Sequence, residues 1–346
     1  MPILAPFALA ASTGALLALP LAPAVRELIS KRDAGPLVTR KDDGRPVNFA
    51  DSLRSRCEFI QSGLDRQGQA LTTGLSESSG TKLFLSPHPG TWTGPSYVDV
   101  LVICREPSQL PEGFVSTENF FARRAIHAGP GSVFRALLGE EEVVLGDGSR
   151  ILRWVHADST LTAGKNCVLF GRASSKRSLI LSSGCRFERM YAPVIYTSGD
   201  AATVPVRTEL APFSHLARAG IGRERLQGKA RLIAGQQHRG DLVVAKSLVM
   251  EDDTSVLGSV KANAEVSIGR RVEIDGSLVS TKPIQVGPGG FIKGPVISEH
   301  EITIGPNVQI GLPEAPTTVS APRICLSPGS VIFGTAWARV EGRVGV

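Results

Sequence analysis

One interval recurs through the C-terminal third of this sequence. An Ile/Val-Gly pair stands at residues 268–269, 286–287 and 304–305, with a constant step of eighteen positions. Three further tracks keep the same interval: Gly240, Gly258, Gly276 and Gly294; Leu242, Val260, Leu278 and Val296; and Leu248, Val266, Ile284 and Ile302. A repeat of fixed length indicates one supersecondary unit stacked several times.

The spacing inside one repeat indicates how the unit folds. The aliphatic residues of one copy are Ile268, Val272, Ile274, Leu278 and Ile284, all separated by even numbers. Because side chains alternate between the two faces of a strand, this set points to one side. Three short strands separated by bends would use up one repeat and bring the chain back one level higher. The sequence therefore predicts an all-β fold, a triangular parallel β-helix in which one eighteen-residue repeat makes one rung.

The glycine track marks a corner of this β-helix. It comprises Gly240, Gly258, Gly276 and Gly294, and Gly334 returns to the same place after the last repeat. We expect each to need a positive φ or the absence of a Cβ atom.

The repeat divides the chain into blocks. A second β-helix block is expected over 232–346, with rungs beginning at Leu232, Met250, Ile268, Val286, Ile304 and Leu326. Its last step is longer than the others, because an extra loop begins at Leu312. A weaker copy predicts a first β-helix block over 139–198, followed by a connector over 199–231. Cys167 and Cys185 occupy the same position on neighbouring rungs of the first block, so mild oxidation is expected to cross-link them.

The N-terminus predicts a membrane anchor. Residues 3–25 carry no charge and are long enough to cross a bilayer as a helix. Arg26, Lys31 and Arg32 follow, and positive charge on this flank places it in the cytoplasm. A cleaved signal peptide and a peripheral hairpin are the alternatives, but a signal peptide would need a basic stretch before the apolar run. We expect a transmembrane anchor over 1–25, a basic juxtamembrane linker over 26–46, and a single-pass inner-membrane protein whose bulk is cytoplasmic.

A small mixed α/β segment is expected over 47–138. Phe49, Leu53, Cys57, Ile60 and Leu64 recur at spacings of three and four, which is typical of an amphipathic helix. Residues 97–104 are typical of a buried strand, and residues 117–127 and 132–138 carry short helical patterns.

Composition and motifs argue against several function classes. The formal net charge is +6 without a run of five basic residues, so nucleic acid is not an expected partner. The five cysteines form no C-x-x-C pair and the six histidines are scattered, so no metal site is expected. Gly222–Lys229 has five residues between its glycines where a phosphate loop has four. We therefore expect no cofactor and no enzyme activity, and any hidden chemistry would lie in residues 83–138.

The C-terminus predicts self-association. An uncovered last rung would present unpaired backbone groups and apolar side chains, a template for another copy. Ile332, Phe333, Ala336 and Trp337 are the candidate contacts of such a homopolymer.

The stretch from Leu226 to Gly287, with G-D-L-V-V-A, V-L-G-S-V-K-A and V-E-I-D-G-S-L at the constant step of the repeat, resembles the bactofilins, bacterial polymer-forming cytoskeletal proteins. The resemblance covers roughly residues 226–346. It implies a right-handed triangular β-helix that polymerises end to end without nucleotide. It also implies a membrane-associated scaffold that positions cell-wall or polysaccharide enzymes and helps to determine cell shape.

A rival interpretation is an enzyme. Left-handed β-helix (hexapeptide-repeat) acyltransferases have a turn of the same length, and the hexad beginning at Ile268 matches their repeat. Such enzymes need a histidine as general base, usually near a projecting loop. His300 lies inside a regular rung, His238 stands at a core-type position, and the insertion over 312–322 contains no histidine. We therefore expect a self-assembling scaffold, with the acyltransferase as the alternative.

Overall fold

The computed structural model describes residue 13 and residues 47–66, 74–78, 81–86, 89–197, 207 and 222–345. The chain divides into two compact units, Met1–Arg45 and Pro46–Val346. All strands described below belong to the second unit.

The N-terminal half of this unit contains one helix, α3 (Asn48–Arg66), and fifteen strands, which we call the first block. The strands are β1 (Gly74–Ser78), β2 (Thr81–Ser86), β3 (Gly90–Thr91), β4 (Tyr97–Val98), β5 (Leu101–Cys104), β6 (Ser108–Gln109), β7 (Val115–Ala122), β8 (Ile126–Ala128), β9 (Val133–Gly139), β10 (Val143–Leu145), β11 (Arg150–Ala157), β12 (Thr160–Ala163), β13 (Val168–Ser175), β14 (Ser178–Leu181) and β15 (Arg186–Tyr196).

The C-terminal half contains seventeen strands, the second block. They are β16 (Arg223–Leu226), β17 (Ala230–Leu232), β18 (Gln237–Arg239), β19 (Asp241–Val244), β20 (Leu248–Met250), β21 (Ser255–Leu257), β22 (Val260–Ala262), β23 (Val266–Ile268), β24 (Glu273–Ile274), β25 (Leu278–Ser280), β26 (Ile284–Val286), β27 (Phe291–Ile292), β28 (Val296–Ser298), β29 (Glu301–Ile304), β30 (Gln309–Ile310), β31 (Thr317–Leu326) and β32 (Val331–Val344).

Both blocks are β-solenoids, with about 13 turns in all, which confirms the all-β prediction. In the second block three strands make a turn, and each strand from β16 to β28 pairs in parallel with the third strand after it, as β17 does with β20. In the last turns the longer strands change this order, since β29 pairs with β31 and β30 pairs with β32. The pairing joins residues of the predicted repeat, for example Met250 with Ile268 and Ile268 with Val286. The loop that begins at Leu312 lengthens one step, so that Ile304 pairs with Leu326.

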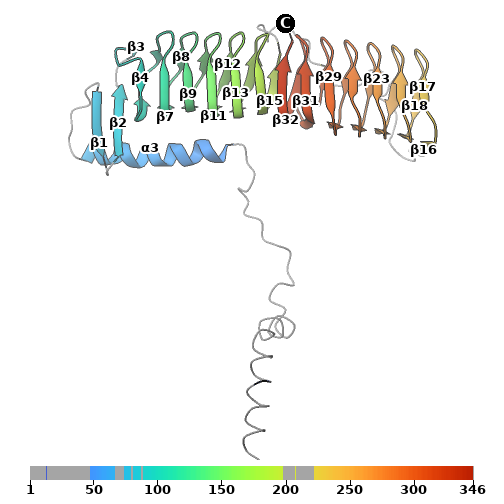
Figure 1. Ribbon diagram of the computed structural model, residues 1–346, viewed down its shortest axis with the longest axis horizontal. Helices are drawn as coiled ribbons and strands as arrows, with labels where there is room; N and C mark the ends of the chain where they lie inside the picture. Colours follow the sequence, from blue (N-terminus) through green and yellow to red (C-terminus); the bar gives the residue numbers. More distant parts are fainter. Residues whose placement is uncertain are drawn as a thin grey trace, which may run out of the picture. The chain divides into compact units, whose positions relative to one another are not determined.

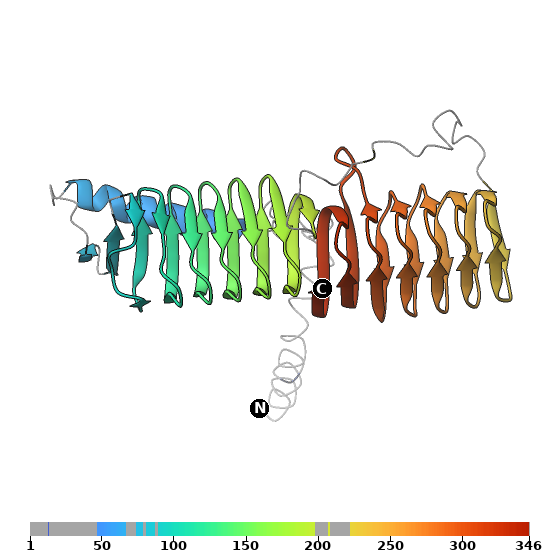
Figure 2. The same ribbon diagram turned by 90° about the horizontal axis from the view of Figure 1, so that it is seen from above.

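The blocks are arranged in a row with opposite chain directions. Figures 1 and 2 show the first block running from β1 to β15, and the second from β16 back to β32, which lies beside β15. The side chains that point inward form one apolar cluster extending through both blocks, from Phe84 to Val344. The two solenoids therefore share a continuous core.

Helix α3 lies along the outside of the first block (Figure 1). The predicted amphipathic helix is confirmed: Leu53, Cys57, Ile60 and Leu64 are buried against side chains of β2, β5, β7 and β9. Phe49 departs from this pattern, since it is 45% exposed at the start of the helix.

The helices predicted over 117–127 and 132–138 are wrong, because these residues form β7, β8 and β9 of the solenoid. The reason is burial on both faces. Phe120 and Leu137 point into the solenoid core, whereas their neighbours Phe121 and Leu138 pack beneath α3. Adjacent apolar residues break the two-residue alternation that identifies a strand whose other face is in solvent.

The solenoid is also longer than the repeat indicates. Turns of the first block begin with β2, inside the segment expected to be mixed over 47–138, and the second block starts at Arg223 rather than at Leu232. The expected strand over 97–104 corresponds to β4 and β5.

Candidate functional sites: the junction, its groove and the open end

The junction is the place where the last turns of the two blocks meet. β15 and β32 pair antiparallel, with Met190 opposite Ala336 and Ile195 opposite Ile332. Backbone hydrogen bonds continue on the neighbouring faces, where Val344 N–H donates to the Cys185 carbonyl at 2.9 Å and Thr197 N–H donates to Ser330 at 3.1 Å. The backbone edges that would otherwise be open at both C-terminal turns are thus paired within the chain.

This arrangement changes the role expected for the four candidate self-association residues. Ile332 and Ala336 are fully buried against β15, Phe333 is 4% exposed, and Trp337 is 42% exposed on the outer face. The prediction of an uncovered C-terminal rung is therefore corrected, because its partner is the first block of the same chain. The sequence carried no signal of this pairing, because it joins residues far apart in the chain.

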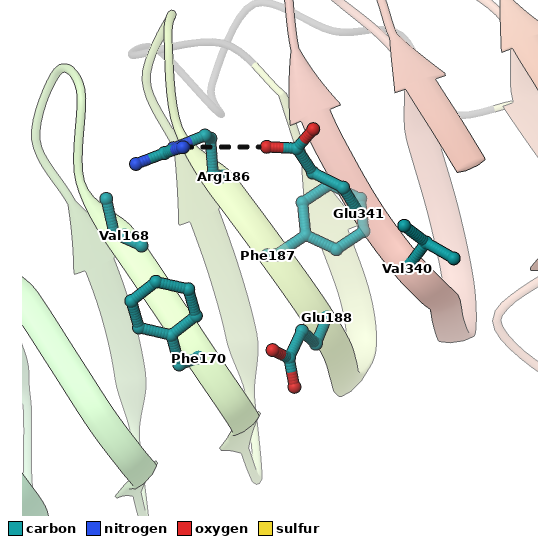
Figure 3. Close-up of a pocket in the computed structure, with 7 residues that line it drawn as sticks. All are labelled: Val168, Phe170, Arg186, Phe187, Glu188, Val340 and Glu341. Atoms are coloured by element: carbon teal, nitrogen blue, oxygen red, sulfur yellow. Dashed lines mark ion pairs between the residues drawn. The ribbon is translucent and has the colours of Figure 1, made fainter. Parts of the chain in front are cut away.

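A groove lies on the outer surface of the junction. Figure 3 shows Val168 and Phe170 on β13, Arg186, Phe187 and Glu188 on β15, and Val340 and Glu341 on β32. The cavity volume is about 180 Å³. An Arg186–Glu341 ion pair of 3.6 Å crosses it, and Phe170 and Val340 are exposed apolar side chains at its margin.

The junction packs tightly beside this groove. Phe187 pairs with Gly342 across the two blocks, and a Cβ atom on Gly342 would collide with the Phe187 ring. Gly342 thus allows the aromatic ring to lie directly over the strand of the other block.

The corner glycines from Gly240 to Gly294 stack on one another, whereas Gly334 lies over Thr317 of the preceding turn. Gly240, Gly258 and Gly334 have φ between +111° and +154°. At Gly276 and Gly294 a Cβ atom would come within 2.6 Å of the backbone of the preceding corner glycine. Side chains are excluded at these two corners by close approach of the neighbouring turn, rather than by φ.

The second block ends at β16, β17 and β18, which we call the open end. Among the residues that the structure describes, each pairs on one side only, with β19, β20 and β21 respectively. Asp241 N–H donates to the Gly222 carbonyl, and Ala245 N–H donates to Leu226. Because backbone groups alternate in direction along a parallel strand, those of Arg223 and Arg225 point toward the unpaired edge.

Polar side chains cover the core at the open end. Glu224 and His238 stand in register with the buried Leu242 and Val256 of the next turn. His238 Nδ1 lies 3.5 Å from a Glu224 carboxylate oxygen, and its buried Nε2 has no hydrogen-bond partner among the described residues.

Arginines surround this open edge. Arg223, Arg225, Arg231 and Arg239 are all exposed. Arg223 lies 3.7 Å from Asp241 and Arg231 pairs with Glu251, whereas Arg225 and Arg239 have no carboxylate partner in the described parts of the chain. A search for runs of basic residues missed them, because in strands they alternate with inward-pointing residues, as in Arg-Glu-Arg-Leu.

A polar network lies under α3. His156 is 1% exposed, and its Nδ1 lies 2.8 Å from the Ser174 hydroxyl while its Nε2 lies 3.0 Å from Asp158. Arg54 of α3 donates to the same aspartate at 2.9 Å and to Glu140 at 2.9 Å. Burial lowers the pKa of His156, although Asp158 opposes this effect, so the imidazole is neutral near pH 7.

The Ser174–His156–Asp158 order is that of a catalytic triad, but the serine and histidine are both buried. A nucleophile without access to substrate cannot react, so this network fastens α3 to the solenoid.

The histidines considered for acyl transfer lie apart. His300 is exposed, with its Nε2 3.3 Å from Lys282 Nζ, whereas His238 belongs to the open end. Within the described residues, no group of three His, Cys, Asp or Glu side chains could hold a metal ion.

Cys167 and Cys185 lie on neighbouring turns, since the residues that follow them, Val168 and Arg186, are paired. Both thiols are fully buried, so an oxidant reaches them only when the turns open. Their cross-linking remains a prediction.

The expected membrane anchor and its basic flank, Arg26, Lys31 and Arg32, lie outside the described residues, apart from Thr13. Among the helices that the structure describes, none is both long and apolar enough to span a bilayer.

No family model, curated protein or solved structure matches the chain.

Proposed function

We propose that this protein is a bactofilin-like, self-assembling scaffold that polymerises without nucleotide through the open end of its second block. The observation that carries the proposal is that no described strand pairs with the outer edge of β16, β17 or β18. An edge of this kind accepts another strand through backbone hydrogen bonds. The junction supports the idea from within the chain, because there two solenoid ends of this protein already pair with each other.

Charge selects which surface of a second copy fits the open end. Two open ends in contact would bring Arg225 and Arg239 of each copy close together, and like charges in that position repel. The other end of the row, formed by β1, β3 and β4, exposes Glu77 and Asp99 and the apolar Leu75. Joining the open end of one copy to the β1 end of the next is a heterologous contact, which produces an open filament.

The proposal includes the handedness, the cross-section and the turn length of the solenoid. A right-handed, triangular helix with one eighteen-residue repeat per turn accounts for three strands per turn in the second block and for pairings such as Leu248 with Val266. On the sequence pattern, residues 3–25 would anchor this rod in the inner membrane, with the scaffold on the cytoplasmic side. Its cargo would be cell-envelope or polysaccharide enzymes, as the resemblance implies.

The test uses a proline at Arg225 in the full-length protein, purified in mild detergent without nucleotide. Proline removes an N–H that points to the open edge, so the pairing of β16 with β19 is kept. We expect unbranched filaments by negative-stain electron microscopy from the parent and from the matched control Arg225→Ala, which keeps its N–H. Arg225→Pro should remain as short particles with an unchanged circular dichroism spectrum.

Filaments of equal length from Arg225→Pro would show that the open edge is not the assembly surface. Compact trimers from all three proteins would overturn the scaffold proposal in favour of the acyltransferase alternative.

A further inference from the structure

A ladder of arginine and aromatic side chains crosses the outside of the junction. Trp337 of β32 is opposite Arg189 of β15, Arg189 is in register with Arg172 of β13, and Arg172 is in register with Trp154 of β11. Phe49, from the first turn of α3, stacks on Trp154 with ring centroids 6.5 Å apart. The ladder thus brings together residues of both blocks and of the helix.

The aromatic rings hold the guanidinium groups in place. The Arg172 guanidinium lies 4.7 Å from the centre of the Phe49 ring, and that of Arg189 lies 5.2 Å from the centre of the Trp337 ring. Stacking on an aromatic face orients arginine while leaving its N–H groups free to donate in the plane.

The two arginines lack an anionic partner in the described part of the chain. They occupy directly paired positions, where strands are about 4.8 Å apart, and like charges there destabilise a sheet. No carboxylate of the described residues forms an ion pair with either one, and the buried Nε of Arg189 has no hydrogen-bond partner there. Burial and the charge of Arg172 both lower the pKa of Arg189, although arginine stays protonated.

We propose that Arg172 and Arg189 bind the acidic group of an anionic saccharide whose sugar ring lies on Trp337. A carboxylate or phosphate accepts paired hydrogen bonds from guanidinium groups and removes the repulsion between them. The Arg189 guanidinium covers part of the Trp337 indole, and the rest of this side chain, which is 42% exposed, offers an apolar surface beside that group. An inorganic anion would satisfy the arginines but leave this surface uncovered, so a ligand with both features fits better.

The site needs only one copy of the chain, so it does not depend on filament formation. It is also separate from the groove in Figure 3, whose walls include neither arginine.

Isothermal titration of the full-length protein tests the site with three probes: a short oligogalacturonate, a neutral oligosaccharide of the same length, and inorganic phosphate. We expect the acidic oligosaccharide to bind at least tenfold more tightly than the neutral one. Arg189→Gln should weaken that binding at least tenfold, about 1.4 kcal/mol, whereas Arg177→Gln, which removes an exposed charge elsewhere, should change it less than twofold. Trp337→Leu should weaken binding of the acidic oligosaccharide but leave binding of phosphate unchanged.

Thermal unfolding measured alongside separates binding from folding, because Arg189→Gln removes a like-charge contact and should not lower the melting temperature. The proposal is refuted if the parent binds no acidic oligosaccharide, if Arg189→Gln binds it as tightly as the parent, or if the neutral probe binds equally well. Tighter binding of single-stranded RNA than of oligogalacturonate, lost in Arg189→Gln, would overturn the saccharide assignment.

Discussion

The corner glycines offer a quantitative test of how closely the turns stack. In Gly276→Ala the new Cβ atom would lie 2.5 Å from the Ser259 hydroxyl oxygen and 2.6 Å from the Gly258 backbone. The serine can rotate away, but the glycine backbone belongs to the turn below and moves only if the turns separate. Overpacking of this kind costs about 1–3 kcal/mol.

Two matched substitutions separate the collision from other effects of losing a glycine. Gly228 has open space around its Cα atom and no positive φ, so Gly228→Ala should change stability by no more than about 1 kcal/mol, in the stabilising direction. Gly235 also has open space but a φ of +70°, so Gly235→Ala should cost about 1–2 kcal/mol from backbone strain alone.

The assay is urea unfolding followed by circular dichroism, with the midpoints of the three variants compared with the parent. Gly276→Ala should lower the midpoint clearly, and Gly228→Ala should leave it unchanged or raise it. If Gly276→Ala and Gly228→Ala unfold at the same urea concentration, neighbouring turns are not in close contact at this corner.

Two further predictions concern buried groups. Burial raises the pKa of Cys57 and of Cys104 to about 12 and keeps Cys167 and Cys185 from solvent, so Ellman's reagent should label about one of the five thiols, Cys325, before unfolding and all five afterwards. Labelling of several thiols in the native protein would contradict the continuous core. The pKa of His156 is lowered on folding, so below about pH 6.5 the unfolded chain binds a proton that the folded chain does not, and stability should fall as the pH falls. The stability lost between pH 7.5 and 5.5 should be smaller in His156→Asn than in the parent. His127→Asn, which replaces an exposed ring, should lose as much as the parent. Equal losses in the two variants would refute this role of His156.

The second block could be predicted because its information is local and repeated. Each turn places an aliphatic residue on the same position of the turn before it, as Val266 does on Leu248, so the register follows from the sequence spacing. The same spacing located the corners at Gly258 and Gly276, whose surroundings are set by the neighbouring turn alone.

The first block was only partly predictable because α3 changes the pattern of its strands. Where the helix covers β7 and β9, Phe121 and Leu138 are buried on the outside, although a sheet face in solvent would carry polar residues there. Two apolar neighbours in a row then resemble a helix or a fully buried strand. Only the position of α3 in space distinguishes these cases.

The candidate sites depend on contacts that no local pattern reports. Arg189 meets Trp337 because the two blocks pair by their C-terminal ends, and Arg172 meets Phe49 because α3 starts at that turn. The arginines of the open end, such as Arg225, could be recognised in the sequence as outward-facing residues, because they alternate with inward-facing residues along a strand. Their importance follows only from knowing that no described strand pairs with the outer edge of β16.

The central claim is that the two solenoids are joined within one chain at β15 and β32, which leaves β16 as the open end. Tyr191 and Thr335 are paired across that junction, and opposed residues of antiparallel strands have Cα atoms about 4.5–5.5 Å apart, within disulfide range. The most direct measurement is oxidation of the double variant Tyr191→Cys, Thr335→Cys at low protein concentration, followed by non-reducing electrophoresis and mass spectrometry. We predict a disulfide within one chain that neither single variant forms. A failure to cross-link, or cross-links only between chains, would contradict the junction and the account built on it.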